Sequence, residues 1–140
     1  MSELTRLREE HAKLSRMFLK LGHAIQHRTP PSQIDLFALR QELTSTLIGH
    51  LKLKDWALYP RLIDSGDDEI SAKGEAFKEE MGGLAPAFLA YCEKWTASSI
   101  TSDWESYCLE TRSLLDAVVD RLARENRELL PLLERLERAA

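Results

Sequence analysis

The chain has 140 residues, of which 44% are hydrophobic and 30% charged, and its formal net charge is −4. Its length and composition predict one globular domain, residues 1–140, with a core large enough to need no disulfide or metal staple. The negative charge and the lack of a basic block argue against nucleic acid as a partner. No apolar run approaches the roughly 18 residues of a membrane span, and the N-terminal MSELTRLREE lacks a signal-peptide core. We therefore expect a cytoplasmic protein with no membrane partner.

The first predicted helix extends from the N-terminus to about His27. Its apolar residues recur at steps of three and four, which is the period of one face of a bundled helix. They are Leu4, Leu7, Leu14, Phe18, Leu21 and Ile25. His11 fills the single gap in this stripe. Pro30 and Pro31 cannot continue the helix, so the first connection is expected there.

The second predicted helix runs from about Leu36 to Ile63, with Ser32 as its expected cap. Its inward stripe contains two polar residues among the leucines: Leu43, Leu47, His50, Lys54 and Leu58. A buried polar residue needs a hydrogen-bond or ion partner, so we expect His50 and Lys54 to have partners in the core. Pro60 is expected to kink the last turn.

The third predicted helix follows a break at residues 65–67. Its stripe is Ile70, Gly74, Phe77, Met81, Leu84, Phe88, Tyr91 and Trp95. Pro86 lies inside this pattern and clashes with the carbonyl group four residues earlier, so a bend is expected at Pro86.

The fourth predicted helix follows a polar break at residues 96–103 and ends near Arg138. Ser102 and Glu105 form its expected capping box. Its inward stripe is Tyr107, Leu114, Val118, Arg121, Glu125, Leu129 and Leu132. Short connections between four helices predict antiparallel neighbours, so the expected fold is all-α, an up-down-up-down four-helix bundle.

The two halves of the chain match each other when the sequence is shifted by 70 or 71 residues. This register predicts an internal two-fold repeat in which two helix pairs share one core. The stripe positions that differ chemically between the halves are His11 and Met81, His50 and Arg121, and Lys54 and Glu125. A symmetric polar site has been partly rewritten at these positions.

These stripe residues carry a resemblance to a known family. The motifs are Glu10-His11-x-x-Leu14 with His50-x-x-x-Lys54-x-x-x-Leu58-Tyr59-Pro60, then Glu80-Met81-x-x-Leu84 with Arg121-x-x-x-Glu125-x-x-x-Leu129-Leu130-Pro131. The chain resembles a hemerythrin-like HHE cation-binding domain over nearly its whole length. The resemblance implies a four-helix bundle around a non-haem di-iron site, in which each half supplies a His, then a His and a Glu four residues apart. It also implies oxygen binding, oxygen or nitric oxide sensing, iron handling or regulation.

Half of the implied ligand positions are altered in this sequence. His11, His50 and Glu125 match the family pattern, whereas Lys54, Met81 and Arg121 replace ligands. Methionine is a soft ligand that suits iron beside carboxylates poorly. A fixed positive charge ~4 Å from a divalent metal costs on the order of 8 kcal/mol at an effective dielectric constant of about 20. We therefore expect no di-iron site and no cofactor.

An ion cluster of Lys54, Arg121 and Glu125 is the expected replacement, with His11 and His50 as neutral hydrogen-bonding members. This cluster has one more cation than carboxylate. A further carboxylate such as Asp55, a bound anion, or an outward-reaching Lys54 would each correct the imbalance.

The predicted function is that of a non-enzymatic binding or regulatory protein, with a homodimer or a protein partner. The wide apolar faces of the second and fourth helices are interpreted as core by default; in the alternative interpretation Trp56 and Trp104 mark a dimer or partner surface. Two alternatives stay open. The first is an iron-dependent, oxygen- or nitric oxide-responsive sensor or oxidoreductase that uses mononuclear iron, or di-iron, at residual ligands His11, His50 and Glu125. The second is a carrier of a small anionic ligand held by Lys54 and Arg121.

Overall fold

The computed structural model of the chain describes residues 3–81 and 83–139. Five side chains lie outside this description, those of Gln33, Ile34, Asp55, Trp56 and Met81. The described residues form helices and turns, with no strand among them. The predicted all-α class is therefore confirmed. Within the described part of the chain, no helix combines the length and the apolar character that crossing a membrane requires.

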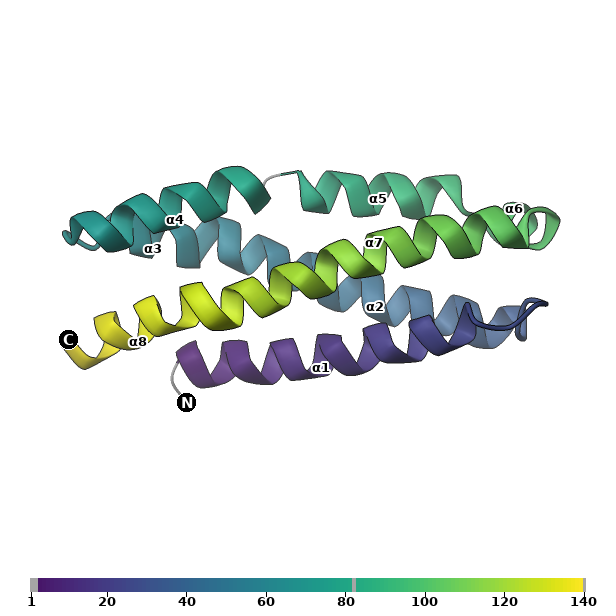
Figure 1. Cartoon of the computed structure of the whole chain (residues 1–140), viewed down its shortest axis with the longest axis horizontal. Coiled ribbons are helices and arrows are strands. Elements are labelled where there is room, and N and C mark those ends of the chain that lie inside the picture. Colours follow the sequence, from purple (N-terminus) through teal and green to yellow (C-terminus); the bar gives the residue numbers. More distant parts are fainter. Residues whose placement is uncertain (1–2, 82, 140) are drawn as a thin grey trace.

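The helical elements follow one another in long runs. They are α1 (Glu3–Ala24), then α2 (Gln33–Leu53), η1 (Lys54–Leu58) and α3 (Tyr59–Ile63), then α4 (Asp68–Met81), α5 (Leu84–Lys94) and α6 (Ala97–Ser102), and finally α7 (Trp104–Arg124), η2 (Glu125–Leu129) and α8 (Leu130–Ala139). Figure 1 shows the long segments side by side along one axis, with α3, α4 and α8 at one end and α6 at the other. The finer prediction of an up-down-up-down bundle with an internal two-fold repeat stays a prediction.

Two π-helical turns stand at matching places in the two halves. The first, η1, ends just before Tyr59-Pro60, and the second, η2, ends just before Leu130-Pro131. Proline has no N–H to donate and clashes with the preceding turn, and a wider turn relieves both problems. The kink predicted at Pro60 stays a prediction; the structure shows a π turn directly before Tyr59-Pro60. Lys54 and Glu125 are the first residues of these two turns.

Several predicted boundaries are wrong by a few residues. The first helix ends at Ala24 rather than near His27, and Ser32 stands before α2 without a capping side-chain hydrogen bond. The predicted break at residues 96–103 contains the short helix α6, whose capping box is formed by Thr96 and Ser99. Such short polar helices leave no apolar period in the sequence, so pattern analysis passes over them.

Two further expectations near prolines and caps also change. The third predicted helix is divided between α4 and α5, and Pro86 lies in the first turn of α5. An N–H in a first turn has no intrahelical partner, so proline costs little there. Asp103, and not Ser102, caps α7 by accepting a hydrogen bond from the N–H of Ser106.

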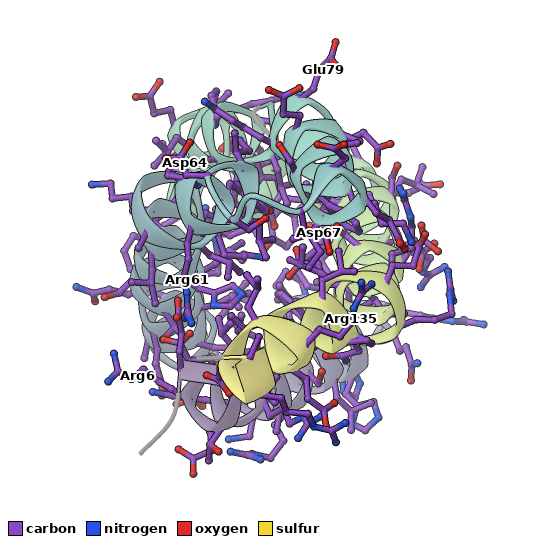
Figure 2. The ribbon with its side chains drawn as sticks, turned by 90° about the vertical axis from the view of Figure 1, so that its left-hand side faces the viewer. Arg6, Arg61, Asp64, Asp67, Glu79 and Arg135 are labelled. Atoms are coloured by element: carbon purple, nitrogen blue, oxygen red, sulfur yellow. The ribbon has the colours of Figure 1, made fainter. Side chains whose placement is uncertain are left out.

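The core consists of two hydrophobic clusters separated by a polar level. One cluster includes Leu14, Leu47 and Leu51, and the other includes Leu7, Leu58 and Leu129. Figure 2 views the molecule from the α3, α4 and α8 end, where labelled charged residues surround the ribbons. At this end Arg135 forms ion pairs with Asp67 and Glu69 at 3.4 and 3.6 Å. Charged side chains are ordinary at an exposed end of a protein. The feature that needs explanation is the polar level inside the core.

Candidate functional site

Four buried polar side chains meet between the two hydrophobic clusters. His11 comes from α1, His50 from α2, Lys54 from the start of η1 and Glu125 from the start of η2. Their exposed fractions are 3%, 2%, 2% and 0%. Leucines one helical turn away on either side seal this level from both ends of the core. A buried charge is stable only when it is paired, so each contact in this group matters.

Lys54 and Glu125 form the centre of the group. The Lys54 Nζ donates to both carboxylate oxygens of Glu125, at 2.5 Å to Oε1 and 2.6 Å to Oε2. Burial raises the pKa of Glu125, but the neighbouring His11 ring and the Lys54 charge outweigh burial and lower this pKa to about 2. Glu125 therefore stays ionised at neutral pH, and its charge is balanced inside the protein.

The two histidines flank this pair with their rings almost perpendicular, the ring centroids 4.9 Å apart. The Nε2 of His11 lies 3.1 Å from Glu125 Oε2, and its Nδ1 lies 2.6 Å from Asn126 Oδ1. The Nδ1 of His50 lies 2.8 Å from Glu10 Oε2. Burial lowers the pKa of His50, and the hydrogen bond to Glu10 only partly opposes this effect. His50 is therefore neutral at pH 7 and donates its Nδ1 proton to the Glu10 carboxylate.

Arg121 does not share the contacts of this group. Among the described residues, the ion partners of Glu125 are Lys54 and His11, and Arg121 lies half-buried beyond ion-pair distance of that carboxylate. Burial lowers the pKa of Arg121, while the negative charge of Glu125 opposes this shift. The prediction that Met81 is ordinary core concerns a side chain outside the described residues. Lys54 does not extend to solvent, so the outward-reaching alternative for Lys54 is wrong.

The group also has the composition of a metal-ligand set. One ligand atom from each of His11, His50 and Glu125 lies within 4.8 Å of the others. The Nε2 atoms of both histidines are buried and make no well-aligned hydrogen bond among the described residues, although His11 Nε2 lies within ion-pair distance of Glu125. Oxygen acceptors on the opposite ring nitrogens, here from Asn126 and Glu10, are the arrangement that orients metal-binding histidines. A cavity of about 310 Å³ reaches His11 from the surface beside Asn126.

Asn126 was not among the residues that sequence reasoning selected, and Glu10 appeared only as part of a motif. Both hold a histidine ring from outside the buried level, and Glu10 is about one-third exposed. Their signal in the sequence is adjacency, since each stands directly beside a predicted site residue. Adjacency alone does not distinguish such partners from solvent-exposed polar residues.

One family of known proteins matches this chain over nearly its whole length. The family model described as hemerythrin HHE cation binding domain matches residues 2–133. No curated protein and no solved structure shows significant similarity to the chain. The match covers both helix pairs and all four residues of the buried polar level.

Proposed function

The chain belongs to the hemerythrin HHE cation-binding family, and we propose that it is a non-enzymatic binding or regulatory member in which an internal ion pair replaces the di-iron centre. The observation that carries this proposal is the contact of Lys54 Nζ with both oxygens of Glu125. An ammonium group at this place balances the carboxylate as a metal would. The bundle is then kept for its shape and its surfaces, with a protein partner or a second copy in the cytoplasm as the expected setting.

The residues at the centre do not fit two irons. The described side chains there offer two imidazoles and one carboxylate, and both oxygens of that carboxylate already accept hydrogen bonds from Lys54. A di-iron centre needs anionic ligands to offset four metal charges, and Lys54 adds a cation instead. Arg121, which stays charged near neutral pH, lies close enough for the Glu125 charge to affect it. The positive charges of Lys54 and Arg121 therefore oppose the binding of two iron ions at this centre.

Metal analysis of the purified protein tests this proposal directly. Protein expressed in iron-replete medium should carry close to no iron and show no oxo-iron absorption band. The triple variant Lys54→Glu, Met81→His and Arg121→His restores the family's ligand types and should acquire iron. Met81→His alone is the matched control and should not, because both cations remain. Close to two irons per chain in the native protein would contradict the proposal.

A second candidate, a single-metal site, is favoured by the two buried histidine nitrogens that make no well-aligned hydrogen bond among the described residues. His11, His50 and Glu125 would hold the ion, with Asn126 and Glu10 orienting the rings. Such an ion would supply Lewis acidity or one-electron redox chemistry, as in a sensor. Binding would require Glu125 to release Lys54 from at least one oxygen, so the site competes with its own ion pair.

Cobalt(II) titration separates these two candidates. If the ion pair is the functional state, native protein should bind cobalt weakly, and Lys54→Met should bind it at least tenfold more tightly. His50→Ala added to Lys54→Met should remove that gain. Stoichiometric, tight metal binding by the native protein, lost in His11→Ala and His50→Ala, would instead establish the single-metal site and overturn the first candidate.

A further inference from the structure

A second buried cation lies on α2, far from the polar centre. Arg40 is 8% exposed, and it precedes Lys54 by fourteen residues, which is roughly 20 Å along a helix. Within the described part of the chain the side chain of Arg40 forms no hydrogen bond and no ion pair, and its Nε is buried without a partner. Only its backbone carbonyl accepts a side-chain hydrogen bond, from the Thr44 hydroxyl at 2.7 Å. Its guanidinium carbon lies 5.6 and 5.8 Å from the ring centroids of Tyr91 and Tyr107. Aromatic faces attract a cation, but they do not neutralise it.

Among the described residues, no neighbour of Arg40 supplies the missing negative charge. Burial raises the pKa of both Tyr91 and Tyr107, so these phenols stay protonated and neutral. The carboxylate of Glu110, on the same side of the fold, is held at 2.8 Å by both Lys94 Nζ and Trp95 Nε1. Arg40 is therefore a buried cation with no anion of its own.

Arg40 also lines a cavity of about 570 Å³ that opens to solvent between α2 and the α5–α6 connection. The cavity surface is mainly apolar, and its other lining side chains include Phe37, Cys92, Trp95 and Ala97. Phe37 is 51% exposed, which is high for a large aromatic side chain and places it at the rim. Apolar pockets of this size with one charged group are typical of small-molecule sites.

We propose that this cavity binds a small amphipathic carboxylate, with the carboxylate on Arg40 and the apolar body against Phe37, Trp95 and Ala97. The planar guanidinium presents two parallel donors that match the two oxygens of a carboxylate. The apolar walls select a hydrocarbon or aromatic body over a sugar or a nucleotide. This site does not involve the Lys54–Glu125 centre, so it does not rest on the function proposed above.

Sequence reasoning assigned an anion to Lys54 and Arg121, and it overlooked Arg40. The signal was present, because Arg40 continues the stripe of Leu43 and Leu47 towards the N-terminal end of α2. A shift of 71 residues places Arg40 on Thr111, which is 1% exposed and bonds Tyr91 through its hydroxyl at 2.7 Å. A second polar level thus stands at matching positions of both halves.

Calorimetric titration with sodium octanoate tests the proposal, with 1-octanol as the uncharged probe of equal length. Octanoate should bind at one site per chain and at least tenfold more tightly than octanol. Arg40→Met should weaken octanoate binding at least tenfold and leave octanol binding unchanged. Arg16→Met, which alters an exposed arginine of α1, is the matched control and should bind octanoate as the native protein does.

A second variant keeps the test valid if Arg40→Met folds poorly. Ala97→Phe narrows the cavity while leaving Arg40 in place, and it should weaken binding of both probes at least tenfold with little change in melting temperature. Equal affinity for octanoate and octanol, or octanoate binding that survives Arg40→Met or Ala97→Phe, would overturn the proposal. No detectable octanoate binding at millimolar concentration would overturn it as well.

Discussion

Lys54 and Arg40 are both buried cations on the same run of helix, and the protein treats them differently. Lys54 meets a carboxylate at 2.5 Å within the protein, whereas Arg40 meets aromatic rings beyond 5.5 Å. Lys54 and Glu125 lie between the two hydrophobic clusters, and the cavity beside Asn126 reaches only His11 of their group, whereas Arg40 itself lines a cavity. A closed pair, a buried ion pair that is neutralised within the protein, stabilises the fold. An open cation, buried beside a cavity without a carboxylate partner among the described residues, can bind an anion from solution. The comparison therefore assigns stability to one site and binding to the other.

The largest expected effect comes from removing the carboxylate of the closed pair. Glu125→Ala should lower the free energy of unfolding by about 3–5 kcal/mol, because the buried Lys54 ammonium loses the carboxylate that accepts two of its hydrogen bonds. Glu125→Gln should cost less, since shape and one hydrogen bond acceptor survive. Urea denaturation of the three proteins measures these differences. A loss within about 0.5 kcal/mol for Glu125→Ala would remove the distinction between the two sites.

The next effect is the dependence of stability on pH. The pKa of Glu125 is lowered to about 2 in the folded protein, so its contribution is full above the unfolded value of 4.5 and is lost as the pH falls towards 2. This shift corresponds to about 3 kcal/mol. The pKa of His50 is also lowered, from 6.5, so folding opposes its protonation and stability begins to fall below pH 6.5.

Melting temperatures between pH 7 and pH 2.5 measure both contributions. The native protein should lose stability in two stages, below pH 6.5 and again below pH 4.5. Glu125→Gln should flatten the second stage and keep the first. A native profile that rises as the pH falls through either stage would show that the buried group favours its protonated form, against the geometry described here.

The sequence predicted this centre well because a polar residue on an apolar stripe is easily recognised. His11, His50, Lys54 and Glu125 all interrupt leucine stripes, and the structure brings all four together. Spacing places Arg121 and Glu125 one α-helical turn apart, and the Glu125 N–H does donate to the Arg121 carbonyl. Spacing could not reveal that the Glu125 carboxylate is directed to Lys54 and His11 rather than to Arg121.

The all-helical class was equally accessible from the sequence, whereas the local ends of helices were not. The three-four periodicity indicated which segments are helical, whereas the π turns before Pro60 and Pro131 were not predicted. Several neighbouring polar residues can adopt the backbone angles of a helix cap. This is why Asp103 caps α7, where Ser102 was predicted to do so. The cavity beside Arg40 arises from the packing of α2 on the connection after α5, and no periodicity describes the space between elements.

A smaller change relative to the native protein is expected when both partners of the closed pair are replaced. The double variant Lys54→Met and Glu125→Met should recover most of the stability lost in Glu125→Ala and lie within about 1 kcal/mol of the native protein or above it. The reason is that two apolar side chains of similar volume carry no desolvation cost. If the double variant is as unstable as Glu125→Ala, the polar level contributes through more than the charge pair, and His11 and His50 become the groups to examine.

The smallest effect on stability is expected at the open cation. Arg40→Met removes a buried charge that has no internal counter-ion, so the lost attraction to Tyr91 and Tyr107 is offset by the desolvation cost that disappears with the guanidinium. The free energy of unfolding should therefore change by less than about 1 kcal/mol, measured by the same urea denaturation as for Glu125→Ala. Arg40→Ala is a useful companion, because it also removes the aliphatic stem and separates lost packing from lost charge. A cost for Arg40→Met comparable to that of Glu125→Ala would mean that Arg40 is satisfied inside the protein, and the division between a closed and an open cation would then fail.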